Sequence, residues 1–175
     1  HNSTIFIKPD DSVEMYHKVH LVPFAEYIPL SENFPSLKKL NFGQGNFTSG
    51  KDYTVFDLDS VRFSNLICYE SSMPKAVRGF VKNGAQFITI QANDGWLGKS
   101  AGPYQHFELA KLRAIENRVP IVRCANTGIS GVISPAGIVQ QKIPLGKKAI
   151  ITADIIPIQN LTFYTKYGEL FAVLC

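Results

Sequence analysis

A cysteine followed directly by a tyrosine and a glutamate is the feature of this sequence that most suggests chemistry. Cys68 ends an apolar, strand-like run, and Tyr69 and Glu70 come directly after it. Farther upstream, a second cluster supplies an amine at Lys18 and a carboxylate at Glu26. A thiol, an amine and a carboxylate are the groups that nucleophilic acyl transfer needs. Because only a thiolate is nucleophilic, a cation such as Lys18 near Cys68 would favour the reactive form.

Each of these residues also has an ordinary structural explanation. Cys68 could be a core thiol at the end of a strand, Lys18 a surface lysine on a strand edge, and Glu26 a solvated loop carboxylate. Composition alone favours these explanations for Cys68 and Glu26. The Tyr69-Glu70 pair and the aromatic surroundings of Lys18 favour chemistry instead.

The bulk composition predicts one compact domain. A chain of 175 residues buries about 70% of its unfolded surface, enough for a real core. Hydrophobic residues make up 45% of the chain and charged residues 18%, which argues against disorder. The net charge of +4 is mild and the lysines are scattered, so we expect no nucleic-acid partner. Weak attraction to an anionic membrane surface stays open.

Cysteine spacing predicts neither a metal site nor a disulfide framework. The three cysteines, Cys68, Cys124 and Cys175, form no Cys-x-x-Cys pair, and their number is odd. We therefore expect no metal and no cofactor. Cys124 lies in an apolar stretch and is expected to be a small buried hydrophobe.

Hydrophobic periodicity and turn residues predict a mixed α/β chain. Strands are expected over residues 3–8, 13–19, 53–58, 61–69, 87–92, 121–125, 129–134, 137–143 and 148–155. Helices are expected over residues 31–40, 74–82 and 104–118. The strand–helix–strand order of the middle third indicates an α/β architecture.

The helix over residues 104–118 shows the strongest helical pattern. Its expected buried stripe follows 3–4-residue spacing and consists of Tyr104, Phe107, Ala110, Leu112, Ala114 and Ile115. Its expected water-facing residues are Glu108, Lys111 and Glu116. His106 near its start is a lone histidine, which is more often structural than catalytic.

Three blocks resemble the nitrilase, or carbon–nitrogen hydrolase, superfamily across nearly the whole chain. They are Tyr-His-Lys-Val-His-Leu at 16–21, Ile-Cys-Tyr-Glu at 67–70, and Gly-Pro-Tyr-Gln-His at 102–106 running into Arg-Ala-Ile-Glu-Asn at 113–117. Within this superfamily, the chain resembles the apolipoprotein N-acyltransferase family of bacteria more than the soluble relatives. That likeness rests on residues 20–30, on Glu70 where soluble relatives more often carry aspartate, and on residues 93–98, 126–128 and 164–171.

The resemblance implies a nitrilase-like α-β-β-α sandwich, present here as a partial domain. Residues 1–168 would form the C-terminal part of the catalytic domain, and residues 169–175 the start of a truncated transmembrane helix. The family uses a Glu–Lys–Cys triad. Because Glu14 stands in the wrong context, the general-base glutamate is expected upstream of this chain. The implied location is the bacterial inner membrane, with the catalytic domain on the periplasmic side.

The resemblance also implies a role for each candidate residue. Cys68 would take an acyl chain from a phospholipid as a thioester, and the N-terminal diacylglyceryl-cysteine amine of an apolipoprotein would then accept it. Lys18 and the backbone N–H of Tyr69 would stabilise the oxyanion, and Glu26 would support the lysine. Glu70 would hold the Cys68 turn or the lysine in place.

Three alternatives stay open from the sequence. Trp96, the only tryptophan, would either line the acyl site or its lid, or serve as an ordinary packing aromatic. A soluble amidase or nitrilase would use water as the acceptor; residues 20–30 and the apolar residues 170–175 argue against it. A non-catalytic binding domain on the same fold is permitted by the missing glutamate.

Overall fold

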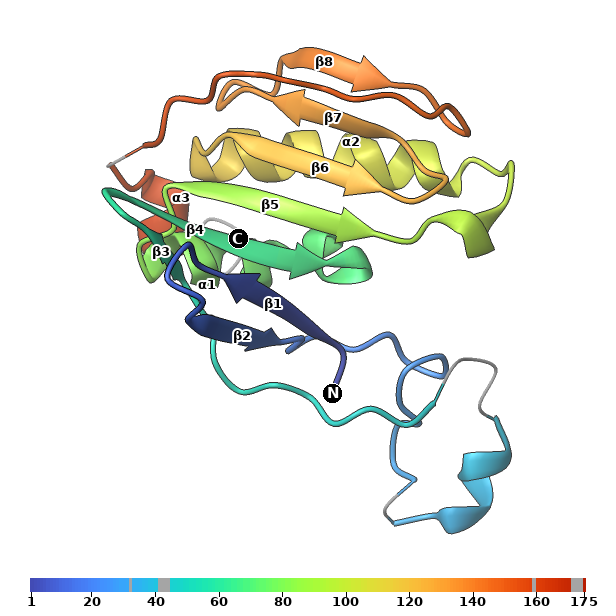
Figure 1. Ribbon diagram of the computed structural model, residues 1–175. Coiled ribbons are helices and arrows are strands. Elements are labelled where there is room, and N and C mark those ends of the chain that lie inside the picture. Colours follow the sequence, from blue (N-terminus) through green and yellow to red (C-terminus); the bar gives the residue numbers. More distant parts are fainter. Residues whose placement is uncertain (32, 41–44, 159, 171–174) are drawn as a thin grey trace.

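A six-stranded mixed sheet forms the centre of the molecule (Figure 1). The computed structural model describes residues 1–31, 33–40, 45–158, 160–170 and 175. In spatial order the strands are β3 (Phe56–Leu58), β4 (Val61–Ile67), β5 (Phe87–Ala92), β6 (Ile121–Ala125), β7 (Ser130–Ile133) and β8 (Val139–Ile143). The middle strands β4, β5 and β6 are parallel, so their carboxyl ends lie along one edge of the sheet.

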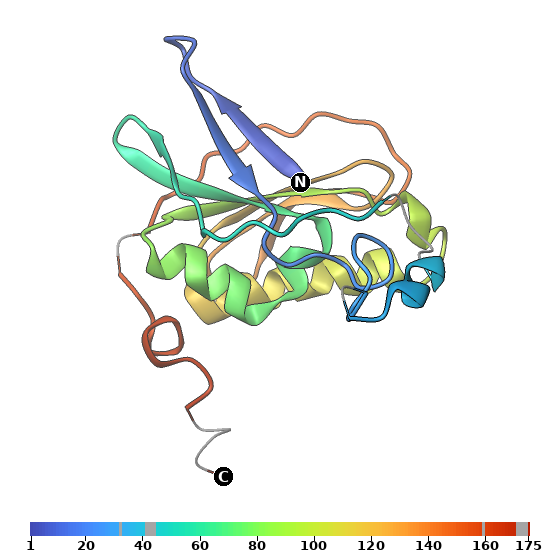
Figure 2. The same ribbon diagram turned by 90° about the horizontal axis from the view of Figure 1, so that it is seen from below.

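Helices cover one face of this sheet (Figure 2). They are α1 (Pro74–Lys82) and α2 (Gly102–Asn117), and the short α3 (Phe163–Tyr167) packs against these two helices. Proline at the first position starts α1, where its missing N–H costs nothing. Strand alternation turns Ile88 and Ile90 of β5 into the core on this side, where α1 buries Val77 and Phe80.

The opposite face carries a hairpin and the extended segment 148–155 (Figure 2). The hairpin consists of β1 (Ser3–Ile7) and β2 (Val13–His17), which pair antiparallel. Phe6 anchors it by packing its ring 5.4 Å from that of Phe56 and 5.2 Å from that of Phe63. The chain is thus layered as helices, a main sheet, and a two-stranded second β layer.

Three short 3-10 helices complete the described secondary structure: η1 (Pro35–Leu40), η2 (Cys68–Ser72) and η3 (Gly95–Leu97). The first of them replaces the helix expected over residues 31–40, because the chain turns helical only at Pro35. η2 begins at Cys68, so the strand expected over residues 61–69 ends at Ile67.

Two sequence predictions about buried and paired segments were wrong. Residues 148–155 form no strand: no described strand pairs with them, and the segment stays largely exposed despite its apolar alternation. On α2, the side chains of Tyr104, Leu112 and Ile115 are exposed. The polar residues His106, Arg113 and Asn117 take their places in the buried stripe.

The expected membrane-entering segment is only partly described. Residues 171–174 of the range 169–175 lie outside the described residues. Within the part of the chain that the structure describes, no helix has the length and apolar character needed to cross a bilayer.

Candidate active site

Cys68 lies at a sharp turn directly after β4, one of the three parallel strands. Its φ of 54° falls in the left-handed region, which is unfavourable by about 1–2 kcal/mol for a residue with a Cβ. Such strained positions persist only where the surroundings enforce them, and they cluster at functional sites. The turn leaves the Cys68 side chain half-buried at the edge where the parallel strands end.

Glu70 joins this turn to the segment that contains Lys18. Its fully buried carboxylate accepts hydrogen bonds from the Tyr16 hydroxyl at 2.5 Å and from the backbone N–H groups of Val19 at 3.0 Å and His20 at 3.1 Å. The second carboxylate oxygen accepts from the N–H of Ile67 at 3.3 Å. Burial raises the pKa of Tyr16 above its ordinary value, and Glu70 raises it further, so the hydroxyl stays protonated and donates.

Replacing Glu70 with glutamine is expected to destabilise the fold. An amide oxygen cannot replace the anion that these donors share, and its NH2 group would face other donors. Losing such charge-assisted hydrogen bonds costs about 1.5–3 kcal/mol in the free energy of unfolding. Urea denaturation measures the loss. Glu108→Gln on the exposed face of α2 is the matched control, expected to change stability by less than about 0.5 kcal/mol; equal effects would contradict the role of Glu70.

Lys18 and Glu26 form an ion pair at the neighbouring loop. The Lys18 amine lies 3.0 Å and 2.7 Å from the two oxygens of Glu26, and the lysine is 0% exposed. Glu26 also accepts from the Asn2 amide at 2.9 Å and from the N–H of Val22 at 2.8 Å. Lys18 is therefore no ordinary surface lysine, and Glu26 no freely solvated carboxylate.

The surroundings of Glu26 keep it ionised. Burial alone would raise the pKa of Glu26, but the hydrogen bonds from Lys18, Val22 and Asn2 outweigh burial and hold the pKa below its ordinary value. A carboxylate with a lowered pKa is a weak proton acceptor. The geometry therefore suits Glu26 to fixing the charged amine of Lys18.

This ion pair predicts a specific loss of stability in acid. Because the folded-state pKa of Glu26 is lowered, its contribution is fully present above the unfolded-state value of about 4.3 and is lost as pH falls through the folded-state pKa. Urea denaturation should show Glu26→Gln less stable than the wild type at about pH 7, with the difference shrinking at about pH 3. A difference that stays constant with pH would contradict this account.

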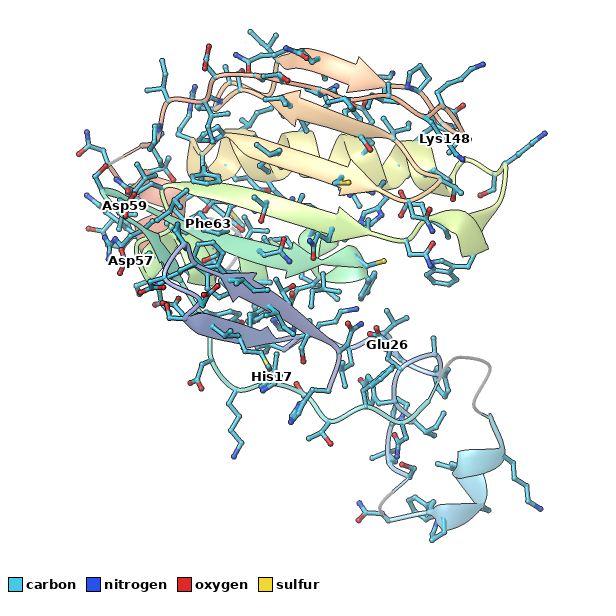
Figure 3. The ribbon with its side chains drawn as sticks, viewed as in Figure 1. His17, Glu26, Asp57, Asp59, Phe63 and Lys148 are labelled. Atoms are coloured by element: carbon cyan, nitrogen blue, oxygen red, sulfur yellow. The ribbon has the colours of Figure 1, made fainter. Side chains whose placement is uncertain are left out.

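A cavity of about 1020 Å³ is lined by three of the predicted site residues, Glu26, Cys68 and Trp96. Its reactive and aromatic lining residues are Glu26, Cys68, Trp96 and Cys124. Its apolar lining residues are Val22, Pro23, Phe24, Ala25, Ile67 and Ala92. Figure 3 shows Glu26 beside the end of β2, on the side of the molecule where β4, β5 and β6 also end. The cavity thus combines two thiols and the anchored carboxylate of Glu26 with largely apolar walls.

The predicted residues differ in their relation to this cavity. Cys68, Glu26 and Trp96 line it, and Lys18 approaches it through its contact with Glu26. Trp96 is 63% exposed, which favours a lining role over packing. Glu70 lies below the turn, and Tyr69 is half-buried beside Cys68.

The expectation that Cys124 is buried was wrong. Cys124 is exposed and lines the cavity, because strand alternation in β6 places Arg123 in the core and Cys124 on the other face. Sequence reasoning also missed four polar lining residues: Asn2, Gln91, Asn93 and Asn126. It further missed the buried residues Asp94 and Arg123. A charge inside an apolar strand was the available signal, since such a charge requires a buried partner.

Comparison with known proteins identifies the family. The family model described as carbon-nitrogen hydrolase matches residues 1–158. The chain belongs to the carbon–nitrogen hydrolase family. Two curated members named apolipoprotein N-acyltransferase are similar to it over almost its entire length. The one from Geobacter metallireducens is 37% identical over 99% of this chain, and the one from Chlorobaculum tepidum is 40% identical over 100%.

This carbon–nitrogen hydrolase chain spans about a third of those two relatives, since the matched region covers 34% of each. Among solved structures, Nit3 of Saccharomyces cerevisiae, a member of branch 10 of the nitrilase superfamily, matches with a TM-score of 0.61 at 21% identity. The match covers 84% of this chain and 50% of Nit3. The expected nitrilase-like α-β-β-α fold, as a partial domain, is confirmed.

Proposed function

We propose that the protein is an N-acyltransferase that moves an acyl chain from a phospholipid to the N-terminal diacylglyceryl-cysteine amine of an apolipoprotein. The observation that carries this proposal is the 37% and 40% identity, across the chain, to relatives named apolipoprotein N-acyltransferase. The cavity supports it, because mostly apolar walls suit an acyl chain beside Cys68.

In the first half-reaction, the Cys68 thiolate attacks the ester carbonyl of the phospholipid. The tetrahedral intermediate carries an oxyanion, stabilised by the Lys18 ammonium and the backbone N–H of Tyr69. Its collapse breaks the ester C–O bond, so a lysophospholipid leaves as an alkoxide and takes up a proton. Cys68 then holds the acyl chain as a thioester.

In the second half-reaction, the α-amine of the lipoprotein attacks the thioester carbonyl. The C–S bond breaks, the thiolate of Cys68 is restored, and the amine loses a proton as the amide forms. Splitting the transfer into two steps lowers the barrier of each, and thioesters are readily aminolysed. In this proposal, the base that accepts the protons is a glutamate outside the 175 residues, which completes a Glu–Lys–Cys triad.

The same proposal assigns the surroundings of the protein. The donor is a membrane phospholipid and the acceptor is lipid-anchored, so the cavity must work at a bilayer surface. We place the catalytic domain, residues 1–168, on the periplasmic side of the bacterial inner membrane. Residues 169–175 are proposed to begin a membrane-spanning segment.

An acceptor competition tests this function. The protein is incubated with a phospholipid labelled in its acyl chain and a synthetic diacylglyceryl-cysteine peptide. Label should appear in an amide on that peptide, and a matched peptide with an acetylated amine should stay unlabelled. Release of labelled fatty acid without peptide labelling would point to a hydrolase that uses water. Unconsumed phospholipid would point to a non-catalytic binding domain.

A further inference from the structure

A buried network of charged and polar side chains lies behind the Cys68 turn, outside the residues that the proposed reaction uses. The Arg123 guanidinium donates to one oxygen of Asp94 at 2.7 Å and to the carbonyl of Ile129 at 3.1 Å. Nδ1 of His106 lies 2.8 Å from the other Asp94 oxygen. Asp94, His106 and Arg123 come from the start of η3, from α2 and from β6, so the network ties three elements together.

The network ends on the backbone of Cys68. Nε2 of His106 lies 3.2 Å from the carbonyl oxygen of Cys68 and 2.9 Å from the Ser71 hydroxyl. Ser71 in turn donates to that same carbonyl at 2.8 Å. The strained backbone of Cys68, at a φ of 54°, is therefore held from below by side chains that do not line the cavity.

Stability alone explains such a network poorly. A buried ion pair contributes little net stability, and apolar side chains of similar volume often replace one at no loss. Burial lowers the pKa of Arg123, while Asp94 and the thiolate form of Cys68 both favour its charge. The guanidinium therefore lies within electrostatic reach of Cys68. Burial by itself would raise the pKa of Asp94. Its interactions with His106 and Arg123 outweigh burial and lower the pKa, so Asp94 stays ionised between them.

We propose that His106 is a positioning residue for Cys68, and that Asp94 and Arg123 hold its ring in the folded chain. Nε2 of His106 fixes the Cys68 carbonyl and thereby aims the thiolate into the cavity, without touching substrate. Through the same turn it sets the direction of the Tyr69 N–H group. The inference rests on the proposed function only in taking Cys68 as the nucleophile.

Alkylation kinetics test this inference with a matched pair of variants. In His106→Gln, the amide reaches the position of Nε2 and can still hold Ser71 and the Cys68 carbonyl. In His106→Asn, the amide reaches only the position of Nδ1 and keeps Asp94 alone. The rate of iodoacetamide modification is measured separately at Cys68 and Cys124 by mass spectrometry of the full chain. Cys124 lines the same cavity and serves as the internal control.

The expected result is specific to one thiol and one variant. His106→Asn should slow modification of Cys68 by about 10- to 100-fold, the usual effect of a small misplacement at a reacting group. His106→Gln should stay within about threefold of the wild type, and Cys124 should react at an unchanged rate in both. In His106→Asn, the kcat of acyl transfer should fall while KM stays unchanged.

Two outcomes would overturn the inference. One is an unchanged Cys68 rate in His106→Asn. The other is an equal change at Cys68 and Cys124, which would indicate general loosening of the fold. If a His106 variant does not fold, Arg123→Lys tests the support of the His106 ring, because one amine replaces the two guanidinium donors to Asp94 and Ile129. It should slow modification of Cys68 but not of Cys124, and rates equal to those of the wild type at both thiols would overturn the inference. Because alkylation requires no phospholipid, the failure of acyl transfer in the wild type would overturn the proposed function and leave this test intact.

Discussion

Replacing Cys68 with alanine is expected to reduce acyl transfer by at least about 10⁴-fold, because the thiol proposed to hold the acyl group is then absent. The measurement is the rate of transfer from labelled phospholipid to the diacylglyceryl-cysteine peptide. The half-buried position of Cys68 at a surface turn predicts that the variant folds normally.

Cys124→Ala is the matched control for this experiment. Both thiols line the same cavity, yet Cys124 lies on the regular strand β6 without the strained turn of Cys68. Its replacement should leave the transfer rate within about twofold of the wild type. If Cys68→Ala retained transfer and Cys124→Ala lost it, the nucleophile would be Cys124, and its assignment to Cys68 would be wrong.

Replacing Lys18 with methionine is expected to lower kcat by about 10²–10³-fold, the typical effect of removing one donor from an oxyanion site. Methionine keeps an unbranched side chain in a site where Lys18 is completely buried, but it removes the ammonium. Glu26 would then keep only the donors Asn2 and Val22. The kinetics of peptide acylation at saturating phospholipid measure the loss.

Lys148→Met is the control for the loss of one positive charge. Lys148 is exposed and does not line the cavity (Figure 3). Its replacement should leave kcat unchanged. If Lys18→Met instead raised KM alone, the lysine would serve ground-state binding, and the oxyanion role would be incorrect.

The elements bounded by residues that start or end a helix or strand were predictable from sequence. The predicted bounds 74–82, 87–92 and 121–125 coincide with α1, β5 and β6. Pro74 starts its helix, Asn83-Gly84 ends it, and Pro120 separates α2 from β6. At each of these positions, one residue type fixes the backbone locally, so tertiary context changes little.

The buried face of α2 was not predictable in the same way. Hydrophobic periodicity assigned Leu112 and Ile115 to the core, whereas Arg113 and Asn117 are buried there. The amide of Asn117 accepts from the hydroxyl of Thr165 at 2.9 Å, a contact with α3 across 48 residues of sequence. Such polar burial depends on partners that are distant in the chain, which periodicity cannot supply.

The candidate site likewise has a part that was predictable from sequence and a part that was not. The block of Cys68, Tyr69 and Glu70 is contiguous, so sequence alone placed a thiol beside a carboxylate. The burial of Lys18 depends instead on Glu26 and on the fold around it. The network behind Cys68 joins residues 68, 94, 106 and 123, which only the parallel order of β4, β5 and β6 brings together.

Trapping the acyl-enzyme tests the central claim most directly. The protein is incubated with labelled phospholipid in the absence of any amine acceptor, digested, and mapped by mass spectrometry. We predict one acyl group on the peptide that contains Cys68, released by hydroxylamine and by the diacylglyceryl-cysteine peptide, and none on the peptide that contains Cys124. Turnover of phospholipid without a Cys68 adduct, or an adduct confined to Cys124, would contradict the account.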